Sequence, residues 1–312
     1  MRDPEAAKHL KILGQVGQVT PVACDIKDEA AVRRMVAGSD AAIKALYHAY
    51  VRPGDGVVML DPSYAMYATY ARMFQAKEKS ISCGKDLSFD PELLLEAIVP
   101  GVRLVLLANP NQPTGSLLSQ GTIKAILNRA AEVGVLVAVD EAYYPFSKET
   151  SLPLVNEYPH LLIIRTFSKA AGLAGLRIGF AVGHPDVIAN LFKVRSVYDV
   201  NTFAIMCASQ ILKHPEIVMD YVAEVEEGRK TLTHGAKELG LIPLPSATNF
   251  MVVRVGHRYS PENVAASVRR YGYIIKGPFS SPCLADCVRV TLGPENLMAR
   301  FLSSLHLALS DI

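Results

Sequence analysis

The sequence predicts an α/β protein in which helices sandwich a mostly parallel sheet, followed by a smaller C-terminal α+β domain. Short apolar runs alternate with amphipathic stretches from about residue 55 onward. The chain has 312 residues, of which 50% are hydrophobic and 20% charged, so it can bury a large core and divide into two domains. The pattern changes near residue 213, where a long polar helix is expected. We therefore predict an N-terminal segment over residues 1–37, a large domain over 38–212 and a small domain over 213–312.

The elements of the large domain follow in chain order. Apolar runs that are typical of buried strands lie at residues 57–60, 103–109, 135–140, 161–165 and 177–182. Helical spacing of apolar residues separates them at 38–50, 63–74, 119–132, 185–193 and 203–212. Because alternating strands and helices produce parallel neighbours, we expect one largely parallel sheet.

The small domain is expected to mix helices with short strands. A helix over about 215–238 is followed by an apolar run at 249–255, a helix at 261–270, apolar runs at 273–276 and 287–292, and a last helix from 294. Residues 1–37 carry alternating charges and show no clear period.

Composition excludes several classes of function. The formal net charge is +2, from 32 basic and 30 acidic residues, so neither nucleic acid nor an anionic membrane is an expected partner. The N-terminus has no apolar leader, and no apolar stretch reaches membrane-spanning length, which favours a cytoplasmic protein. The cysteines form an odd set without a CxxC pair, which indicates neither a disulfide framework nor a zinc site. They are Cys24, Cys83, Cys207, Cys283 and Cys287.

The stretch TFSKAAGLAGLRIG places Lys169 and Arg177 beyond a buried strand. Charged side chains usually lie on solvated surfaces, which is the alternative here. In open α/β sheets, however, ligands bind beyond the carboxyl ends of the strands. The preceding strand therefore delivers the hydroxyls of Thr166 and Ser168, together with the Lys169 amine, to a candidate binding crevice.

Two further polar groups follow the same logic. Asp140 comes directly after the apolar run VLVAV, where a carboxylate needs a cationic partner, although a helix cap or a structural ion pair is also open. Ser39 and Asp40 begin an expected helix whose free amides can bind an anion, although plain capping is the commoner use of such residues.

Together these groups match pyridoxal 5′-phosphate. A primary amine at Lys169 can form a Schiff base with the aldehyde, and a carboxylate at Asp140 can keep the pyridine nitrogen protonated. The helix start, the hydroxyls and Arg177 suit the phosphate.

At these residues the chain resembles the fold-type I pyridoxal-phosphate enzymes, and it is most similar to histidinol-phosphate aminotransferases. The resemblance runs from about Gly38 to the C-terminus and implies a large domain of the aspartate-aminotransferase type. The motifs that carry it occur in the family's order: AGSDAAI, DPSYAMY, ANPNQPTG, VDEAYYPF, RTFSKAAGLAGLRIGF and CVRVTLG.

The resemblance implies a role for each matching residue. Lys169 would be the Schiff-base lysine and general acid/base, Asp140 would pair with the pyridinium nitrogen, and Tyr143 would hydrogen-bond the ring hydroxyl. Tyr64 would stack on the ring, and Arg289 would grip the substrate's carboxylate or phosphate. The phosphate of the cofactor would be held by Ser39, Asp40, Thr166, Ser168 and Arg177.

The sequence departs from the family at three places. Gln112 stands where an asparagine usually contacts the ring hydroxyl, and Lys276 stands where histidinol-phosphate enzymes carry an arginine. Lysine lacks the bidentate fork that suits phosphate, so we expect histidinol phosphate to be a poor substrate and a carboxylate on Arg289 to be preferred. Met1 occupies the place of a tyrosine that reaches the partner's cofactor phosphate, so residues 1–37 are expected to be a truncated form of the family's N-terminal segment.

The resemblance implies a homodimeric aminotransferase that moves an amino group between an amino acid or phosphorylated amine and a 2-oxo acid. A decarboxylase of the phosphothreonine type uses the same cofactor scaffold and is the second hypothesis. A non-catalytic, aminotransferase-like binding module is the third. Retention of Lys169 favours an enzyme.

Overall fold

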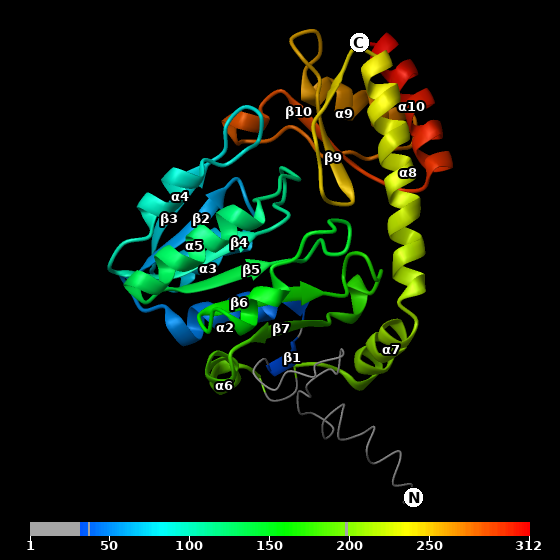
Figure 1. Ribbon diagram of the computed structural model, residues 1–312. Helices are drawn as coiled ribbons and strands as arrows, with labels where there is room; N and C mark the ends of the chain where they lie inside the picture. The colour runs from blue at the N-terminus through cyan, green and yellow to red at the C-terminus, as the bar shows by residue number, and fades with distance from the viewer. Residues whose placement is uncertain (1–31, 37, 197–198) are drawn as a thin grey trace, which may run out of the picture.

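The computed structural model describes residues 32–36, 38–196 and 199–312, and most of the predicted N-terminal segment lies outside this range. Figure 1 shows a part built on a seven-stranded sheet and, beside it, a smaller part built on a three-stranded sheet. We call residues 32–213 the large unit and residues 216–312 the C-terminal unit. The helix α7 (Thr202–Lys213) leads into the long helix α8 (Glu216–Glu238), which runs up to the C-terminal unit.

The large sheet has the strand order β1-β7-β6-β5-β4-β2-β3. Five consecutive strands, β6, β5, β4, β2 and β3, pair in parallel, so the predicted largely parallel sheet is confirmed. The strands are β1 (Val32–Val36), β2 (Gly56–Asp61), β3 (Lys77–Ser82), β4 (Val102–Ala108), β5 (Leu136–Asp140), β6 (Leu161–Thr166) and β7 (Gly179–Gly183).

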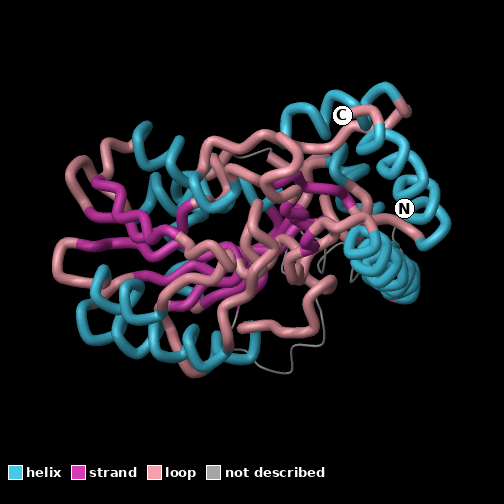
Figure 2. The backbone as a smooth tube through the Cα atoms, turned by 90° about the horizontal axis from the view of Figure 1, so that it is seen from above, coloured by secondary structure: helices cyan, strands magenta, loops and turns pink. Residues whose placement is uncertain are grey.

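Both faces of this sheet are buried under helices (Figure 2). Successive residues of a strand point to opposite faces, so an uninterrupted apolar run fills two cores. In β4, Leu104 and Leu106 belong to one core, while Val105 and Leu107 belong to the other. The first core is closed by α2 (Gly38–Tyr50), α3 (Met66–Met73) and α6 (Pro185–Val194), and the second by α4 (Pro91–Ala97) and α5 (Gln120–Val133).

The C-terminal unit packs three helices against a small antiparallel sheet of order β10-β9-β8. Its remaining elements are β8 (Ile242–Pro243), β9 (Phe250–Arg254), α9 (Pro261–Arg270), β10 (Cys287–Thr291) and α10 (Glu295–Ser310). The predicted α+β character of this part of the chain is confirmed.

Several sequence predictions need correction. The run at 177–182 does not continue the parallel sheet, because β7 is antiparallel to β6. A parallel return requires a crossover of a dozen or more residues, usually a helix, and residues 167–178 contain only one short 3-10 turn. Residues 273–276 form no strand, and Lys276 makes only an isolated bridge to Arg289. The elements β1, β3, α4 and β8 were not predicted.

The helix α8 packs closely against the backbone just before α10, and this contact allows a prediction about stability. A Cβ atom on Gly228 would overlap the carbonyl oxygen of Gly293, which is backbone and cannot rotate away. Gly228→Ala is therefore expected to destabilise the protein by about 1 to 3 kcal/mol in urea unfolding. The control is Gly121→Ala on α5, where the nearest atom, Ser119 Oγ, lies 3.6 Å away and alanine should be neutral or stabilising. Equal stability of the two variants would contradict this account.

Candidate active site

The carboxyl ends of β4, β5 and β6 meet at one edge of the large sheet, where α/β proteins bind their ligands. Asp140 ends β5 and Thr166 ends β6. The segment that follows β4 brings Gln112 to the same edge, and the segment that follows β6 brings Lys169. Residues predicted from three separate parts of the sequence thus lie together.

Asp140 is a buried carboxylate with two hydrogen-bond donors. Only 4% of the residue is exposed. The hydroxyl of Tyr67 donates to Oδ2 at 2.9 Å, and the backbone N–H of Ala142 donates to Oδ1 at 3.1 Å. Burial raises the pKa of Asp140 to about 6, although these hydrogen bonds and the charge of Lys169 favour ionisation. A cationic ligand atom beside this carboxylate would complete its charge pairing.

Lys169 presents a half-buried amine to the same space. Its Nζ atom lies 5.4 Å from the ring centroid of Tyr143. Burial lowers the pKa of Lys169, and the positive charges of Arg289 and Arg177 lower it further, while Asp140 opposes them. A lowered pKa increases the share of neutral amine, which is the nucleophilic form.

A cluster of anion-binding groups lies where α2 begins beside β7. A Cβ atom on Gly38, whose φ is +77°, would come within 2.9 Å of Arg177 Nη2, so glycine leaves room for the guanidinium. A Cβ atom on Gly179 would come within 3.0 Å of the Ser39 backbone nitrogen. These two glycines let Arg177 lie against the N-terminus of α2, and both the helix terminus and the guanidinium favour an anion.

The neighbouring hydroxyls face the same cluster. Thr166 Oγ1 donates to Ser168 Oγ at 2.9 Å, and both residues line the same cavity as Arg177. Arg177 donates to the carbonyl oxygen of Ala174 at 3.1 Å, and no carboxylate forms an ion pair with it within the residues that the structure describes. Its charge is therefore available to a ligand.

Two aromatic residues border the cavity and are fixed by hydrogen bonds. Tyr143 donates to Gln112 Oε1 at 2.9 Å, so the glutamine is held beside the tyrosine hydroxyl. Tyr64 donates to Asp40 Oδ1 at 3.3 Å, and Tyr70 donates to Asp40 Oδ2 at 2.8 Å. The carboxylate of Asp40 is thus occupied by tyrosine hydroxyls on α3 and on the segment before it.

All ten residues predicted to bind the cofactor line one cavity of about 100 Å³. They are Ser39, Asp40, Tyr64, Gln112, Asp140, Tyr143, Thr166, Ser168, Lys169 and Arg177.

The two residues predicted to bind substrate lie on the C-terminal unit, outside the lining of this cavity. Arg289 lies on β10 with its guanidinium 4.8 Å from the ring centroid of Phe250, and Phe250 contacts Tyr143 edge-on. Burial lowers the pKa of Arg289, while Tyr143 raises it. Lys276 pairs with Arg289 through backbone hydrogen bonds of 2.7 and 3.0 Å, so the two cations are neighbours on adjacent segments.

The sequence analysis missed Tyr67 and Tyr70, which hold the two carboxylates of the site. Burial and the Asp140 charge raise the pKa of Tyr67 well above its usual value, so it remains a hydrogen-bond donor. The spacing of the tyrosines could have identified them. Tyr64, Tyr67 and Tyr70 are three residues apart, which places all three on one side of α3 and of the segment that precedes it.

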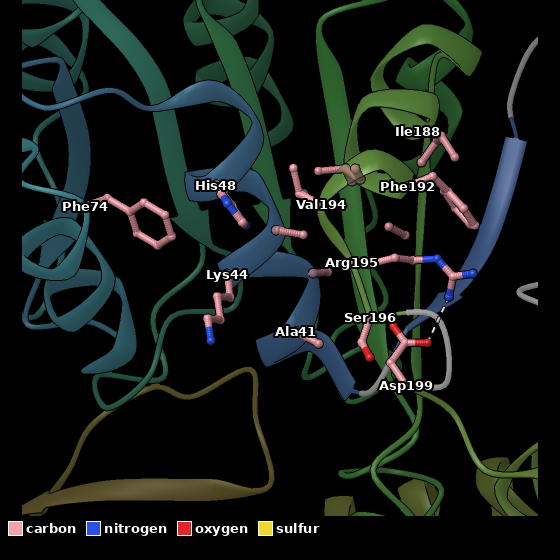
Figure 3. A pocket seen from close by; sticks show the side chains of 14 residues that line it. Ala41, Lys44, His48, Phe74, Ile188, Phe192, Val194, Arg195, Ser196 and Asp199 are labelled. Atoms are coloured by element: carbon pink, nitrogen blue, oxygen red, sulfur yellow. Dashed lines mark hydrogen bonds and ion pairs between the residues drawn. The ribbon is translucent and has the colours of Figure 1, made fainter. Parts of the chain in front are cut away.

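Figure 3 shows a second cavity, of about 390 Å³, between α2 and α6. Two of its polar members, Arg195 and Asp199, form an ion pair at 2.8 Å, and its lining shares no residue with the first cavity. The described part of the chain holds no cluster of His, Cys, Asp and Glu that could bind a metal ion, and none of its helices is long and apolar enough to cross a membrane.

Comparisons with known proteins agree with this geometry. The family model described as aminotransferase class I and II matches residues 24–305. A histidinol-phosphate aminotransferase of Chlorobium luteolum is 35% identical over 275 residues, which are 87% of this chain and 75% of the relative. One of Roseiflexus castenholzii is 35% identical over 83% of this chain and 70% of its own.

Solved structures share the fold. The histidinol-phosphate aminotransferase of Clostridium acetobutylicum aligns with a TM-score of 0.85 and 22% identity, covering 92% of this chain and 86% of that one. The enzyme of Sinorhizobium meliloti, solved in complex with pyridoxal 5′-phosphate, aligns with a TM-score of 0.80 and 26% identity, covering 89% and 77%.

Proposed function

Because the chain belongs to the class I and II aminotransferases, which depend on pyridoxal 5′-phosphate, we propose that its ten cavity residues hold this cofactor and that Arg289 and Lys276 select the amino donor. The chain is a pyridoxal-phosphate-dependent aminotransferase. The observation that carries the assignment of the site is the meeting of Lys169, Asp140 and Arg177 around one cavity.

The residues present fit the cofactor group by group. The buried carboxylate of Asp140 suits a protonated ring nitrogen. Arg177, which forms no ion pair within the described part of the chain, suits a phosphate together with the N-terminus of α2. The half-buried amine of Lys169 suits an aldehyde. When bound, the cofactor supplies an electron sink for the bond that breaks at the amino donor.

The protein's own groups then perform binding and proton transfer. Lys169, with its lowered pKa, accepts and returns a proton beside the reacting carbon. Asp140 stays ionised above about pH 6, helped by the hydroxyl of Tyr67. Gln112 Oε1 accepts from the Tyr143 hydroxyl and so orients it.

Arg177→Ala is expected to weaken cofactor binding by roughly ten- to a hundredfold, because a charge-assisted hydrogen bond is worth about 1.5 to 3 kcal/mol. Fluorescence titration of the cofactor-free protein measures the affinity. The control is Arg270→Ala on α9, whose ion pair with Asp311 lies on the exposed surface and away from the cavity. Unchanged affinity in Arg177→Ala would show that the phosphate is held elsewhere.

For the substrate, we propose an amino donor whose carboxylate is bound by Arg289. The relatives are named for histidinol phosphate, which makes that compound the necessary comparison. Lys276, whose backbone pairs with that of Arg289, provides a point charge without the fork that binds phosphate in two places. Histidinol phosphate is therefore expected to react more slowly than the best amino acid donor.

Steady-state kinetics with histidinol phosphate and a panel of amino acids tests the proposal. Lys276→Arg is expected to raise kcat/KM for histidinol phosphate by about tenfold, the gain of one charge-assisted contact, while leaving the amino acid rates unchanged. Equal kcat/KM for histidinol phosphate and the best amino acid in the unmodified protein would overturn the preference.

We further propose that the enzyme is a cytoplasmic homodimer with domains over residues 38–212 and 213–312. The two separate sheets support the division. Phe203 and Met206 on α7 are 63% and 59% exposed, which supports burial of this helix against a second copy. Light scattering coupled to size-exclusion chromatography tests the dimer.

A further inference from the structure

Cys83 of the large unit and Cys283 of the C-terminal unit are far apart in the sequence, but their side chains are in contact. Cys83 follows β3 in the large unit, and its backbone N–H donates to Asp61 at 3.0 Å. Cys283 lies in the short 3-10 helix Pro282–Leu284 of the C-terminal unit. The two Sγ atoms are 2.6 Å apart, and both residues are free thiols and partly exposed. A disulfide bond of about 2.05 Å thus needs only a small approach of the two sulfurs.

The surroundings hold the two segments together. The Arg254 guanidinium of β9 donates across the units to the carbonyl oxygen of Lys85 at 2.6 Å, and it pairs with Asp286. Beneath these contacts, Leu87 of the large unit packs with Val252 and Leu284 of the C-terminal unit, and both cysteines adjoin this apolar cluster. The cysteines are therefore neighbours through packing as well as through their own contact.

The pair is chemically asymmetric. Burial raises the pKa of Cys83 well above its usual value, and its hydrogen bond to Cys283 adds to the rise. Cys83 Sγ donates to Cys283 Sγ in that hydrogen bond, so Cys283 is the acceptor sulfur of the pair. The hydrogen bond and the charge of Asp286 raise the pKa of Arg254, so this guanidinium remains charged beside the two segments.

We propose that Cys83 and Cys283 form a reversible disulfide that ties the large unit to the C-terminal unit and slows turnover. The oxidant is a low-molecular-weight disulfide. Cys283 loses its proton, and its sulfur attacks one sulfur of this small disulfide. The leaving sulfur takes up a proton and departs as one small thiol, and a mixed disulfide remains on Cys283. Cys83 then loses its proton and attacks the Cys283 sulfur, which releases the second small thiol. Two protein thiols are oxidised, and one small disulfide is reduced to two thiols.

The consequence for turnover follows from where the bond lies. The chain already joins the two units through α7 and α8, on the side of the molecule away from β3 (Figure 1). A bond between Cys83 and Cys283 adds a second attachment. Lys169 belongs to the large unit and Arg289 to the C-terminal unit, so a fixed separation restricts any movement that brings substrate to the lysine. This part rests on the proposed substrate role of Arg289.

The test treats the cofactor-loaded enzyme with oxidised glutathione and maps its peptides by mass spectrometry without reduction. We expect a cross-linked pair of peptides containing residues 83 and 283, loss of two titratable thiols, and a several-fold slower turnover that dithiothreitol restores. Cys83→Ser and Cys283→Ser should each abolish the cross-link and the slowing. Cys207→Ser, which removes a partly exposed thiol on α7, is the matched control and should retain both.

Other outcomes overturn the proposal. Stable glutathione adducts without the cross-link, or a bond between Cys283 and Cys287, would show that Cys83 is not the partner. A complete cross-link with unchanged turnover would show that the disulfide does not control activity. Reduced enzyme that is inactive with every amino donor would instead contradict the proposed substrate site, and the peptide map would still decide the disulfide.

Discussion

Replacing Lys169 with alanine is expected to abolish the covalent link between protein and cofactor and to lower transamination by at least about a thousandfold. The side chain combines two functions that no neighbour can take over. Its amine has a lowered pKa because of burial and of Arg289, and it lines the cavity opposite Asp140. Among the residues that the structure describes, no other lysine lines that cavity.

Borohydride reduction followed by peptide mapping measures this directly. The unmodified protein should carry the reduced cofactor on the peptide that contains Lys169, and Lys169→Ala should carry none. Lys193→Ala is the control, because this lysine lies exposed on α6 and bonds only to Asn190 among the contacts described. A single labelled lysine elsewhere in Lys169→Ala would show that the assignment is wrong.

Replacing Asp140 with asparagine is expected to stabilise the cofactor-free protein and to impair the enzyme. The pKa of Asp140 rises from 3.8 to about 6 on folding because of burial. The folded protein therefore binds more protons between these values, and its free energy of unfolding falls as pH rises through this interval. Above pH 6 the penalty is complete and amounts to roughly 3 kcal/mol, which Asp140→Asn removes.

The pH dependence supplies the control. The advantage of Asp140→Asn in urea unfolding should be present at pH 7 to 8 and should vanish below about pH 4, where the aspartate is neutral as well. With cofactor bound, loss of the charge partner should lower turnover by roughly ten- to a hundredfold. Asn128→Ala on α5 removes an exposed amide that accepts a hydrogen bond from the partly buried Tyr158, and it should change neither result. An asparagine variant that is less stable at every pH would contradict the electrostatic explanation.

The sequence predicted the parallel strands β2, β4, β5 and β6 well because each contains a run of apolar residues. β4, β5 and β6 are buried on both faces, and a double-sided core leaves a clear signal. The strand β3, KEKSIS, lies at the edge of the sheet and carries alternating exposed residues, so composition gives no such signal. The strand β1 depends on its partner β7 for its place.

The candidate site was predictable where chemistry demands one residue type. An amine, a carboxylate and a guanidinium stand out in apolar sequence, and the cavity contains all three. The hydroxyl of Tyr67 could not be assigned, because its role depends on α3 lying beside the end of β5. The contact between Cys83 and Cys283 depends in the same way on the packing of two units.

The reversal of β7 makes the two principal cations of the site parts of a single hairpin. Thr166 pairs with Gly179, and the segment between them is pinned by hydrogen bonds from Phe167 to Ile178 and from Leu173 to Phe167. The separation between Lys169 and Arg177 is therefore set locally and does not depend on the more distant strands. Such a hairpin sets the geometry of the site by itself. Substitutions elsewhere in the sheet leave the distance between the Lys169 amine and the Arg177 guanidinium unchanged. Insertion of one residue between them would change the distance from the phosphate-binding guanidinium to the reacting amine.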